Sequence, residues 1–226
     1  MKILVIGFQR SGTTLLRRLI DLHPNVLWIL HETRLLSKEG LTNVNVISRY
    51  IKNNISNAES YKFATILKKN WGEKLPWYGN GSNIIYYANK WSNIFRDESK
   101  IIHIVRHPID VALSNVEKKG FDPTTVIKYY SNYIPRVIKA LKKKCLIITF
   151  EDLVLNPRDT LIKVFKYCNL NTSNEVIDNI ILAKKDKLRY FDGINKSRAF
   201  AYKEKPDLGF KCKFDYDSLR KKIGLK

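Results

Sequence analysis

Short runs of apolar residues recur along the chain and predict the strands of a parallel sheet. These runs are rich in Ile, Val and Leu, as is typical of strands that are buried on both faces. They occupy Ile3–Ile6, Val26–Leu30, Asn83–Lys90, Lys100–Arg106 and Cys145–Phe150. Stretches with apolar residues three and four positions apart separate most of them and predict helices. The alternation predicts an α/β class, a P-loop-like three-layer fold with a central parallel sheet flanked by helices.

The helical pattern recurs throughout the chain. A first helix begins at Thr13, where the loop after the first strand ends. Pro135 falls inside a long helical stretch and predicts a kink there. Further helices are predicted over residues 44–55, 59–71, 92–97, 109–119, 122–144, 158–168 and 173–185.

Composition limits the possibilities without choosing among them. The chain has 226 residues, 44% of them hydrophobic. This is enough for one sizeable core, so we expect a single domain over residues 1–226. Lys and Arg number 41 against 21 Asp and Glu, which gives a net charge of +20. Such a balance favours an anionic ligand or surface, although most of these charges are expected on a solvated surface.

Cysteine usage and the first residues bear on location. Cys145, Cys168 and Cys212 have neither metal-binding spacing nor an even count, which indicates a reducing compartment. No secretory or membrane-spanning segment precedes the first strand, which begins at Lys2. We therefore expect a cytoplasmic protein with no membrane span.

The loop between Gly7 and Gly12 is the most informative stretch. It joins the first strand to the first helix, where free backbone N–H groups and the positive end of the helix dipole attract an anion. Its spacing is that of the P-loop G-x-x-x-x-G-K-[ST], but Thr13 stands in place of the lysine and Thr14 follows it. Without that lysine the loop still suits a phosphate-like group, and Arg10 supplies charge. The alternative is an ordinary turn with a glycine at each end.

The loop and the residues after it resemble a known family. Arg10-Ser-Gly-Thr-Thr-Leu-Leu, followed by Asp21-Leu-His-Pro-Asn-Val, resembles the 5′-phosphosulfate loop of sulfotransferases that use 3′-phosphoadenosine 5′-phosphosulfate (PAPS). His31-Glu32-Thr-Arg34 is most similar to the tyrosylprotein sulfotransferases. The resemblance implies that Glu32 is the general base, with His31 as a weaker candidate beside it. Taken alone, Glu32 is better explained as an exposed carboxylate or a helix-start residue, and the resemblance reverses that preference.

Two further segments match positions that the family uses. Arg106-His-Pro-x-Asp-Val-Ala-x-Ser114 resembles its 3′-phosphate site, and Lys118 matches a further basic position. The planar fork of arginine suits phosphate, although a strand-end arginine also caps turns. Asn89-Lys90 matches the pair that supplies the lysine stabilising the transferring sulfuryl group. By itself a lysine at a strand end is usually a surface charge.

The second half of the chain resembles the family more loosely. Phe150-Glu-Asp-Leu-Val-Leu-Asn-Pro157 resembles its Tyr-Glu-x-Leu-x-x-x-Pro segment, with Phe in place of the tyrosine that contacts the donor. Near the C-terminus, the family closes a basic loop over the nucleotide, and Arg198 and Lys205 are candidates for it. Ser197 lies near the position of the family's sulfuryl-stabilising serine. Residues 72–82, with the helices before them, are expected to form a lid that faces the acceptor.

The resemblance implies in-line sulfuryl transfer from PAPS to an acceptor hydroxyl or amine, with 3′-phosphoadenosine 5′-phosphate (PAP) as the product and no metal. Arg10, Lys90 and the N–H groups of Ser11 to Thr14, which include that of Gly12, are expected to hold the 5′-phosphosulfate. Peptide, saccharide, lipid and metabolite acceptors all remain open, as does the oligomeric state. A P-loop kinase, which needs ATP and Mg²⁺, is the enzymatic alternative, and Thr13 argues against it. A nucleic-acid-binding module is the non-enzymatic alternative and rests on the charge alone.

Overall fold

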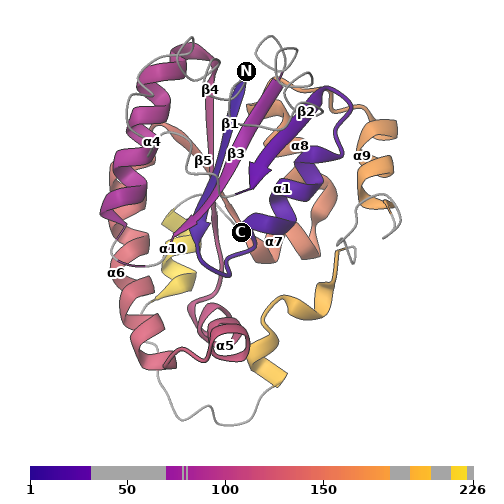
Figure 1. The fold of residues 1–226 in the computed structure, drawn as a ribbon. Helices are drawn as coiled ribbons and strands as arrows, with labels where there is room; N and C mark the ends of the chain where they lie inside the picture. The colour runs from indigo at the N-terminus through magenta and orange to yellow at the C-terminus, as the bar shows by residue number, and fades with distance from the viewer. Residues whose placement is uncertain (32–69, 78, 80, 184–193, 205–214, 223–226) are drawn as a thin grey trace, which may run out of the picture.

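A five-stranded parallel sheet forms the centre of the molecule (Figure 1). The computed structural model describes residues 1–31, 70–77, 79, 81–183, 194–204 and 215–222. Its strands run in the order β2-β3-β1-β4-β5, and every neighbouring pair is parallel. They are β1 (Lys2–Phe8), β2 (Val26–His31), β3 (Asn70–Trp77), β4 (Ser99–Val105) and β5 (Cys145–Thr149).

Helices cover both faces of the sheet (Figure 1). One layer consists of α4 (Ser82–Phe95) and α6 (Pro123–Leu141), and the other contains α1 (Thr13–Asp21), α8 (Pro157–Tyr167) and α9 (Asn174–Ile181). The three-layer α/β fold predicted from the sequence is therefore confirmed. The remaining described elements are η2 (Arg96–Glu98), α5 (Pro108–Lys119), α7 (Phe150–Leu155), η4 (Lys196–Arg198), η5 (Ala201–Glu204) and α10 (Tyr216–Lys222).

The core has two halves because alternate side chains of β1 point to opposite faces of the sheet. Leu4, Ile6 and Phe8 pack with residues of α4 and α6. Ile3 and Val5 pack with residues of α1, α8 and α9. Every residue of β1 is buried, and this explains why its sequence is a continuous apolar run rather than an alternating one.

The strand order fixes where a ligand can bind. From β1 the chain moves to β2 at one edge of the sheet, whereas β4 and β5 lie on the other side of β1. In open parallel sheets, ligands bind outside the carboxyl ends of the strands where the order diverges in this way. The carboxyl ends of β1 and β4 meet at that point, and each leads into a loop that the sequence predicts to bind phosphate.

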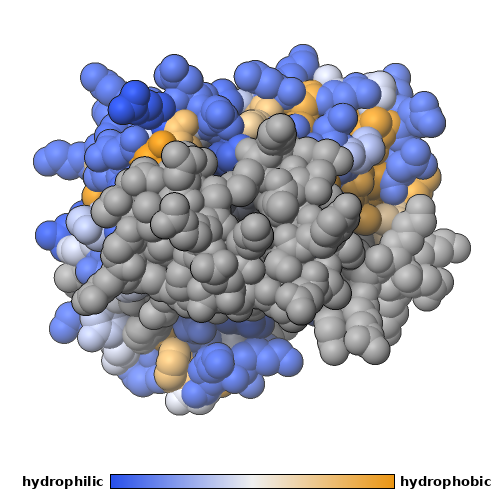
Figure 2. Space-filling view, turned by 45° about the horizontal axis from the view of Figure 1, so that its top comes forward, coloured by the Kyte–Doolittle hydropathy of each residue, from blue (hydrophilic) through white to orange (hydrophobic). Residues whose placement is uncertain are grey.

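Among the described residues that Figure 2 colours, hydrophilic ones predominate, and the hydrophobic ones form patches between them. This is usual for a protein surface. In the described part of the chain, no helix combines the length and apolar character that crossing a bilayer requires.

One strand prediction is wrong. Residues 83–90 lie within helix α4 and not in a strand. The buried side chains of α4 are Ile84, Tyr87, Ala88, Trp91 and Phe95, which are spaced three and four residues apart as a helix requires. The apolar run resembled a strand because it is rich in Ile and Tyr, but its buried positions follow the helical period.

The strand β3, which lies inside the sheet between β2 and β1, was also missed. The helix predicted over 59–71 is wrong at its end, because Trp71 belongs to β3. Most of that range, and the helix predicted over 44–55, lie outside the described residues. The expected lid over 72–82 is wrong for residues 72–77, which complete β3 between β1 and β2.

Candidate active site

The loop after β1 is held in a tight curve by backbone hydrogen bonds. The N–H of Gln9 donates to the Trp77 carbonyl at 2.8 Å, and the N–H of Ser11 donates to the Phe8 carbonyl at 3.1 Å. Arg10 and Gly12 both have positive φ angles, of 71° and 97°. Gly12 is also the N-cap of α1. A side chain at Gly12 would clash, since a Cβ would lie 2.4 Å from a ring carbon of Phe150.

This geometry leaves the first turn of α1 open to a ligand. The first N–H groups of a helix have no partner within it, and they lie at the positive end of the helix dipole. Gly12, Thr13 and Thr14 line a pocket at this point. The loop is fastened from the other side by Asn115 of α5, whose amide donates to the Gln9 carbonyl at 3.4 Å.

Arg106 follows β4 directly and lines the pocket. Its guanidinium donates to the carbonyls of Arg10 at 3.3 Å and Arg198 at 2.8 Å, and lies 4.3 Å from the centre of the Phe150 ring. Its backbone is fixed by Tyr130, whose hydroxyl accepts from the Arg106 N–H and donates to the Arg106 carbonyl. Burial lowers the pKa of Arg106, and Asp110 opposes this shift.

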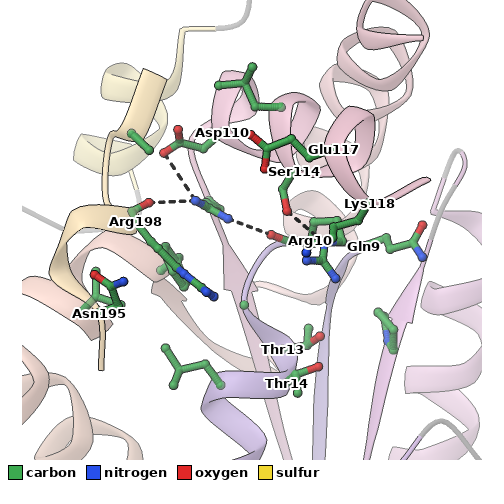
Figure 3. A pocket seen from close by; sticks show the side chains of 18 of the residues that line it. Gln9, Arg10, Thr13, Thr14, Asp110, Ser114, Glu117, Lys118, Asn195 and Arg198 are labelled. Carbon is green, nitrogen blue, oxygen red and sulfur yellow. Dashed lines mark hydrogen bonds and ion pairs between the residues drawn. The ribbon is translucent and has the colours of Figure 1, made fainter. Parts of the chain in front are cut away.

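The two predicted phosphate motifs meet in space. Nε of Arg10, in the loop after β1, donates to the Ser114 hydroxyl of α5 at 3.0 Å (Figure 3). Burial lowers the pKa of Arg10, the neighbouring positive charge of Arg198 lowers it further, and Glu117 raises it. Two guanidinium groups therefore repel each other across the pocket, and an anion placed between them would relieve that repulsion.

Lys74 of β3 enters the same pocket and was not predicted from the sequence. Its side chain is 1% exposed, and Nζ donates to the Thr14 hydroxyl at 3.3 Å. In the sheet, Lys74 is paired with Val5 of β1 on one side and His31 of β2 on the other. A buried ammonium group therefore lies against the first turn of α1, where a helix favours negative charge rather than positive.

The pocket has a volume of about 670 Å³, within the range of small-molecule sites (Figure 3). Positive side chains dominate its described lining, with Asp110 and Glu117 as the only carboxylates there. Among the residues that the structure describes, no three His, Cys, Asp or Glu side chains gather closely enough to hold a metal ion. The positively charged residues that line the pocket are Arg10, Arg18, Lys74, Arg106, Lys118 and Arg198.

Comparison with known proteins agrees with the two phosphate motifs. Residues 2–174 match the model of the Sulfotransferase family. The chain belongs to this family. The match includes the loop after β1, Lys74, and the Arg106–Ser114 motif that forms the opposite wall of the pocket.

Individual sulfotransferases are similar along most of the chain. Protein-tyrosine sulfotransferase 2 of Gallus gallus is 23% identical over 200 residues, which cover 77% of this chain and 53% of the relative. The chain thus spans about half the length of that protein. The sulfotransferase domain of the curacin biosynthetic pathway superposes with a TM-score of 0.69 at 16% identity, covering 99% of this chain and 97% of that domain. The sulfotransferase domain of the Synechococcus PCC 7002 olefin synthase superposes with a TM-score of 0.67 at 19% identity, covering 100% of this chain and 95% of that domain.

The structure brings together most of the residues that were predicted for the sulfotransferase site. Arg10, Thr13, Arg106, Ser114 and Arg198 line one pocket, as do Gly12, Thr14 and Lys118. Ser11 is buried in the loop beneath them. Glu32 and Lys205 lie outside the described residues. Glu32 directly follows His31, the last residue of β2, and His31 pairs with Lys74 of β3.

The placement of Lys90 does not fit the role predicted for it. Lys90 lies on α4 and is absent from the described lining of the pocket, whereas Lys74 is in that lining. The lysine that reaches the loop after β1 is therefore Lys74. Sequence reasoning also passed over Gln9, Arg18 and Glu117, since no local pattern distinguishes these polar residues from others on helix and loop surfaces.

Proposed function

We propose that this chain transfers a sulfuryl group from PAPS to an acceptor hydroxyl or amine and releases PAP. One observation carries the proposal: Arg10 of the first phosphate motif lies 3.0 Å from Ser114 of the second, inside one positively charged pocket. A donor with a phosphosulfate at one end and a phosphate at the other needs two such motifs. A nucleoside triphosphate carries its phosphates in one chain and needs the P-loop lysine, in place of which this chain has Thr13.

The residues around the pocket suit this donor. Gly12 permits the tight turn that presents the backbone N–H groups of Gly12, Thr13 and Thr14 to a phosphosulfate, since any Cβ at Gly12 would meet Phe150. The Ser11 N–H, expected from the sequence to contribute, donates to the Phe8 carbonyl instead. Arg106, Ser114 and Lys118 would hold the 3′-phosphate, and Arg10 and Arg198 would neutralise charge between the two ends. Arg106 donates two N–H groups to backbone carbonyls. Because a guanidinium has five N–H donors, it can bind these carbonyls and a phosphate at the same time.

Catalysis in this proposal depends on positioning and on charge. The S–O bond to the donor's 5′-phosphate breaks as a new bond forms from sulfur to the acceptor, S–O for a hydroxyl and S–N for an amine, and negative charge develops on the bridging oxygen. Lys74 is positioned to stabilise that charge from a buried site, where electrostatic stabilisation is strongest. Glu32 would accept the acceptor's proton, a contribution typically worth about 10²–10⁴-fold. Its support is its place directly after His31, which pairs with Lys74.

Calorimetric titration with adenosine 3′,5′-bisphosphate tests the proposal. We expect binding by the wild type and weaker binding by Ser114→Ala and Lys118→Ala. The matched control is Lys119→Ala, because Lys119 is exposed on the same helix and is not among the described residues that line the pocket. It should bind as the wild type does at the same ionic strength.

The two alternatives predict different titrations. A kinase would bind ATP with Mg²⁺ in preference to the bisphosphate, and that result would refute the sulfotransferase proposal. A nucleic-acid-binding module would bind duplex DNA or RNA with an affinity that falls steeply with salt, and would ignore the bisphosphate. Binding of the bisphosphate at moderate salt, with ATP excluded, is the outcome that supports sulfuryl transfer.

A further inference from the structure

The segment over residues 194–204, which contains η4 and η5, forms one wall of the pocket. Asn195, Ser197, Arg198 and Ala201 all line the cavity. None of the residues from 194 to 203 is fully buried, and only Ile194 and Ala199 pack partly buried side chains against the core cluster that also contains Leu16 and Phe150. Three residues that follow β4 contact it: Arg106, His107 and Asp110. The role of Arg106 is already described, and Asp110 also lines the pocket, where it forms an ion pair with the Arg106 guanidinium at 3.8 Å. His107 has no role so far.

Asp110 binds the backbone of the segment. Its Oδ1 accepts a hydrogen bond from the Tyr202 N–H at 3.0 Å. Burial raises the pKa of this carboxyl, and the positive charge of Arg106 and the N–H groups of Tyr202, Phe200 and Ala201 oppose that shift. Phe200 has a φ of 53°, in the left-handed region. Consecutive N–H groups around a left-handed residue form a concavity that binds anions, and here the Asp110 carboxylate occupies it.

His107 supplies an apolar contact beside this hydrogen bond. Its ring stacks on that of Tyr202, with centroids 4.2 Å apart and planes 12° apart. Burial lowers the pKa of His107 to about 4, with Lys203 and Arg106 lowering it further and Asp217 opposing them. The ring is therefore neutral near pH 7 and binds Tyr202 by stacking. Arg106 completes the attachment through the Arg198 carbonyl at 2.8 Å.

These contacts hold Arg198 in an unfavourable place. Its positive charge lowers the pKa of Arg10 across the pocket, which means that the two guanidinium groups repel each other. Without these contacts, the repulsion between the two positive charges would favour positions of Arg198 further from Arg10. When the segment is attached, Arg198 is already in position before an anion arrives. Binding of the anion then does not have to overcome the entropic cost of ordering the segment.

We propose that His107 and Asp110 are positioning residues that hold Arg198 at the anion pocket by anchoring the 194–204 segment. This inference rests on the proposed function only in the choice of ligand. The Arg106–Ser114 motif then has two tasks: Arg106 and Ser114 face the anion, while His107 and Asp110 hold the segment that forms the opposite wall.

Tyr202→Ala tests the anchor without changing a residue that lines the pocket. It removes the ring that stacks on His107, and Tyr202→Phe is the matched control because it keeps that ring. If the segment is docked about a tenth of the time in the alanine variant, affinity for adenosine 3′,5′-bisphosphate falls about tenfold. The phenylalanine variant should stay within about twofold of the wild type. Asp110→Asn, which removes the charge but keeps an acceptor, should also weaken binding.

A double-mutant cycle separates positioning from general damage. If Tyr202 acts only through Arg198, then Tyr202→Ala should have no further effect on affinity in an Arg198→Ala background. Additive losses in that cycle would overturn the proposal. Circular dichroism of each variant identifies any that fails to fold, and Tyr202→Ala remains decisive if Asp110→Asn is one of them, because Tyr202 is only partly buried.

Hydrogen exchange tests the anchor with no ligand present. In the free protein, the amides of residues 200–202 should exchange about tenfold faster in Tyr202→Ala and Asp110→Asn than in the wild type. Unchanged exchange would overturn the anchoring. If the wild type binds no bisphosphate, the proposed function fails, and exchange decides the anchoring by itself.

Discussion

Replacing Lys74 by Met tests the assignment of the catalytic lysine. The change removes a buried ammonium group and keeps an unbranched side chain of similar length in β3. Lys74 Nζ is 3.3 Å from the Thr14 hydroxyl, at the first turn of α1. Two unit charges about 4 Å apart interact by about 4 kcal/mol at the effective dielectric constant typical of proteins. Lys74 also stabilises the bound donor before the reaction, and only the additional stabilisation of the transition state affects the rate. We therefore expect the rate constant to fall by about 10²–10³-fold in Lys74→Met.

The assay is single-turnover release of adenosine 3′,5′-bisphosphate from PAPS with water as the acceptor, so no acceptor needs to be identified first. Lys90→Met is the matched control, because Lys90 lies on α4 and is absent from the described lining of the pocket. It should retain the wild-type rate within about twofold. A wild-type rate in Lys74→Met, or an equal loss in both variants, would refute the assignment. Thermal unfolding of both variants checks that the rates compare folded proteins.

Three further predictions concern the loop, the core and the backbone of Arg106. Gly12→Ala should lower the free energy of unfolding by about 1–3 kcal/mol and weaken bisphosphate binding, because its Cβ would lie 2.4 Å from the Phe150 ring. Thermal unfolding and calorimetric titration measure the two effects, and wild-type values in both would contradict this prediction. Burial lowers the pKa of His103 to about 3 in the folded protein. As pH falls, His103 is therefore protonated at a higher pH in the unfolded chain than in the folded one. The free energy of unfolding should drop by up to about 1.4 kcal/mol per pH unit from roughly pH 6.5 down to pH 3, and His103→Gln should flatten this slope in urea titrations; parallel curves would count against it. Tyr130→Phe leaves the backbone N–H and carbonyl of Arg106 without their hydroxyl partner and should cost about 1–3 kcal/mol in the same urea assay; an unchanged midpoint would contradict that.

The sequence predicted four of the five strands because buried parallel strands appear as continuous apolar runs. β3 breaks that rule. Its sequence, Asn70-Trp-Gly-Glu-Lys-Leu-Pro-Trp77, contains Gly, Pro and two charged residues. Glu73 is 0% exposed and accepts from the Tyr87 hydroxyl, and Lys74 is 1% exposed and donates to Thr14. Both charged residues are accommodated by partners that are distant in sequence, so no local pattern reveals this strand.

The same distinction separates the predictable part of the site from the rest. Arg10 and Arg106 each follow a strand or lie in the loop after it, and the carboxyl ends of parallel strands meet at one edge. Their convergence therefore followed from the sequence once the strands were located. Ser114 is two turns further along a helix that begins at Pro108, so its position was also fixed by local structure.

Arg198 reaches the pocket for a different reason. No strand end delivers it, and the segment around it is only partly buried and contains only short 3-10 turns. Its position depends on Asp110, which accepts from the Tyr202 N–H across a separation of 92 residues. In the sequence Asp110 looks like an ordinary first-turn acidic residue of α5, where the helix dipole favours it. A carboxylate that serves the first turn of one helix while binding the backbone of another segment leaves no trace in local patterning, so this contact emerged only from the structure.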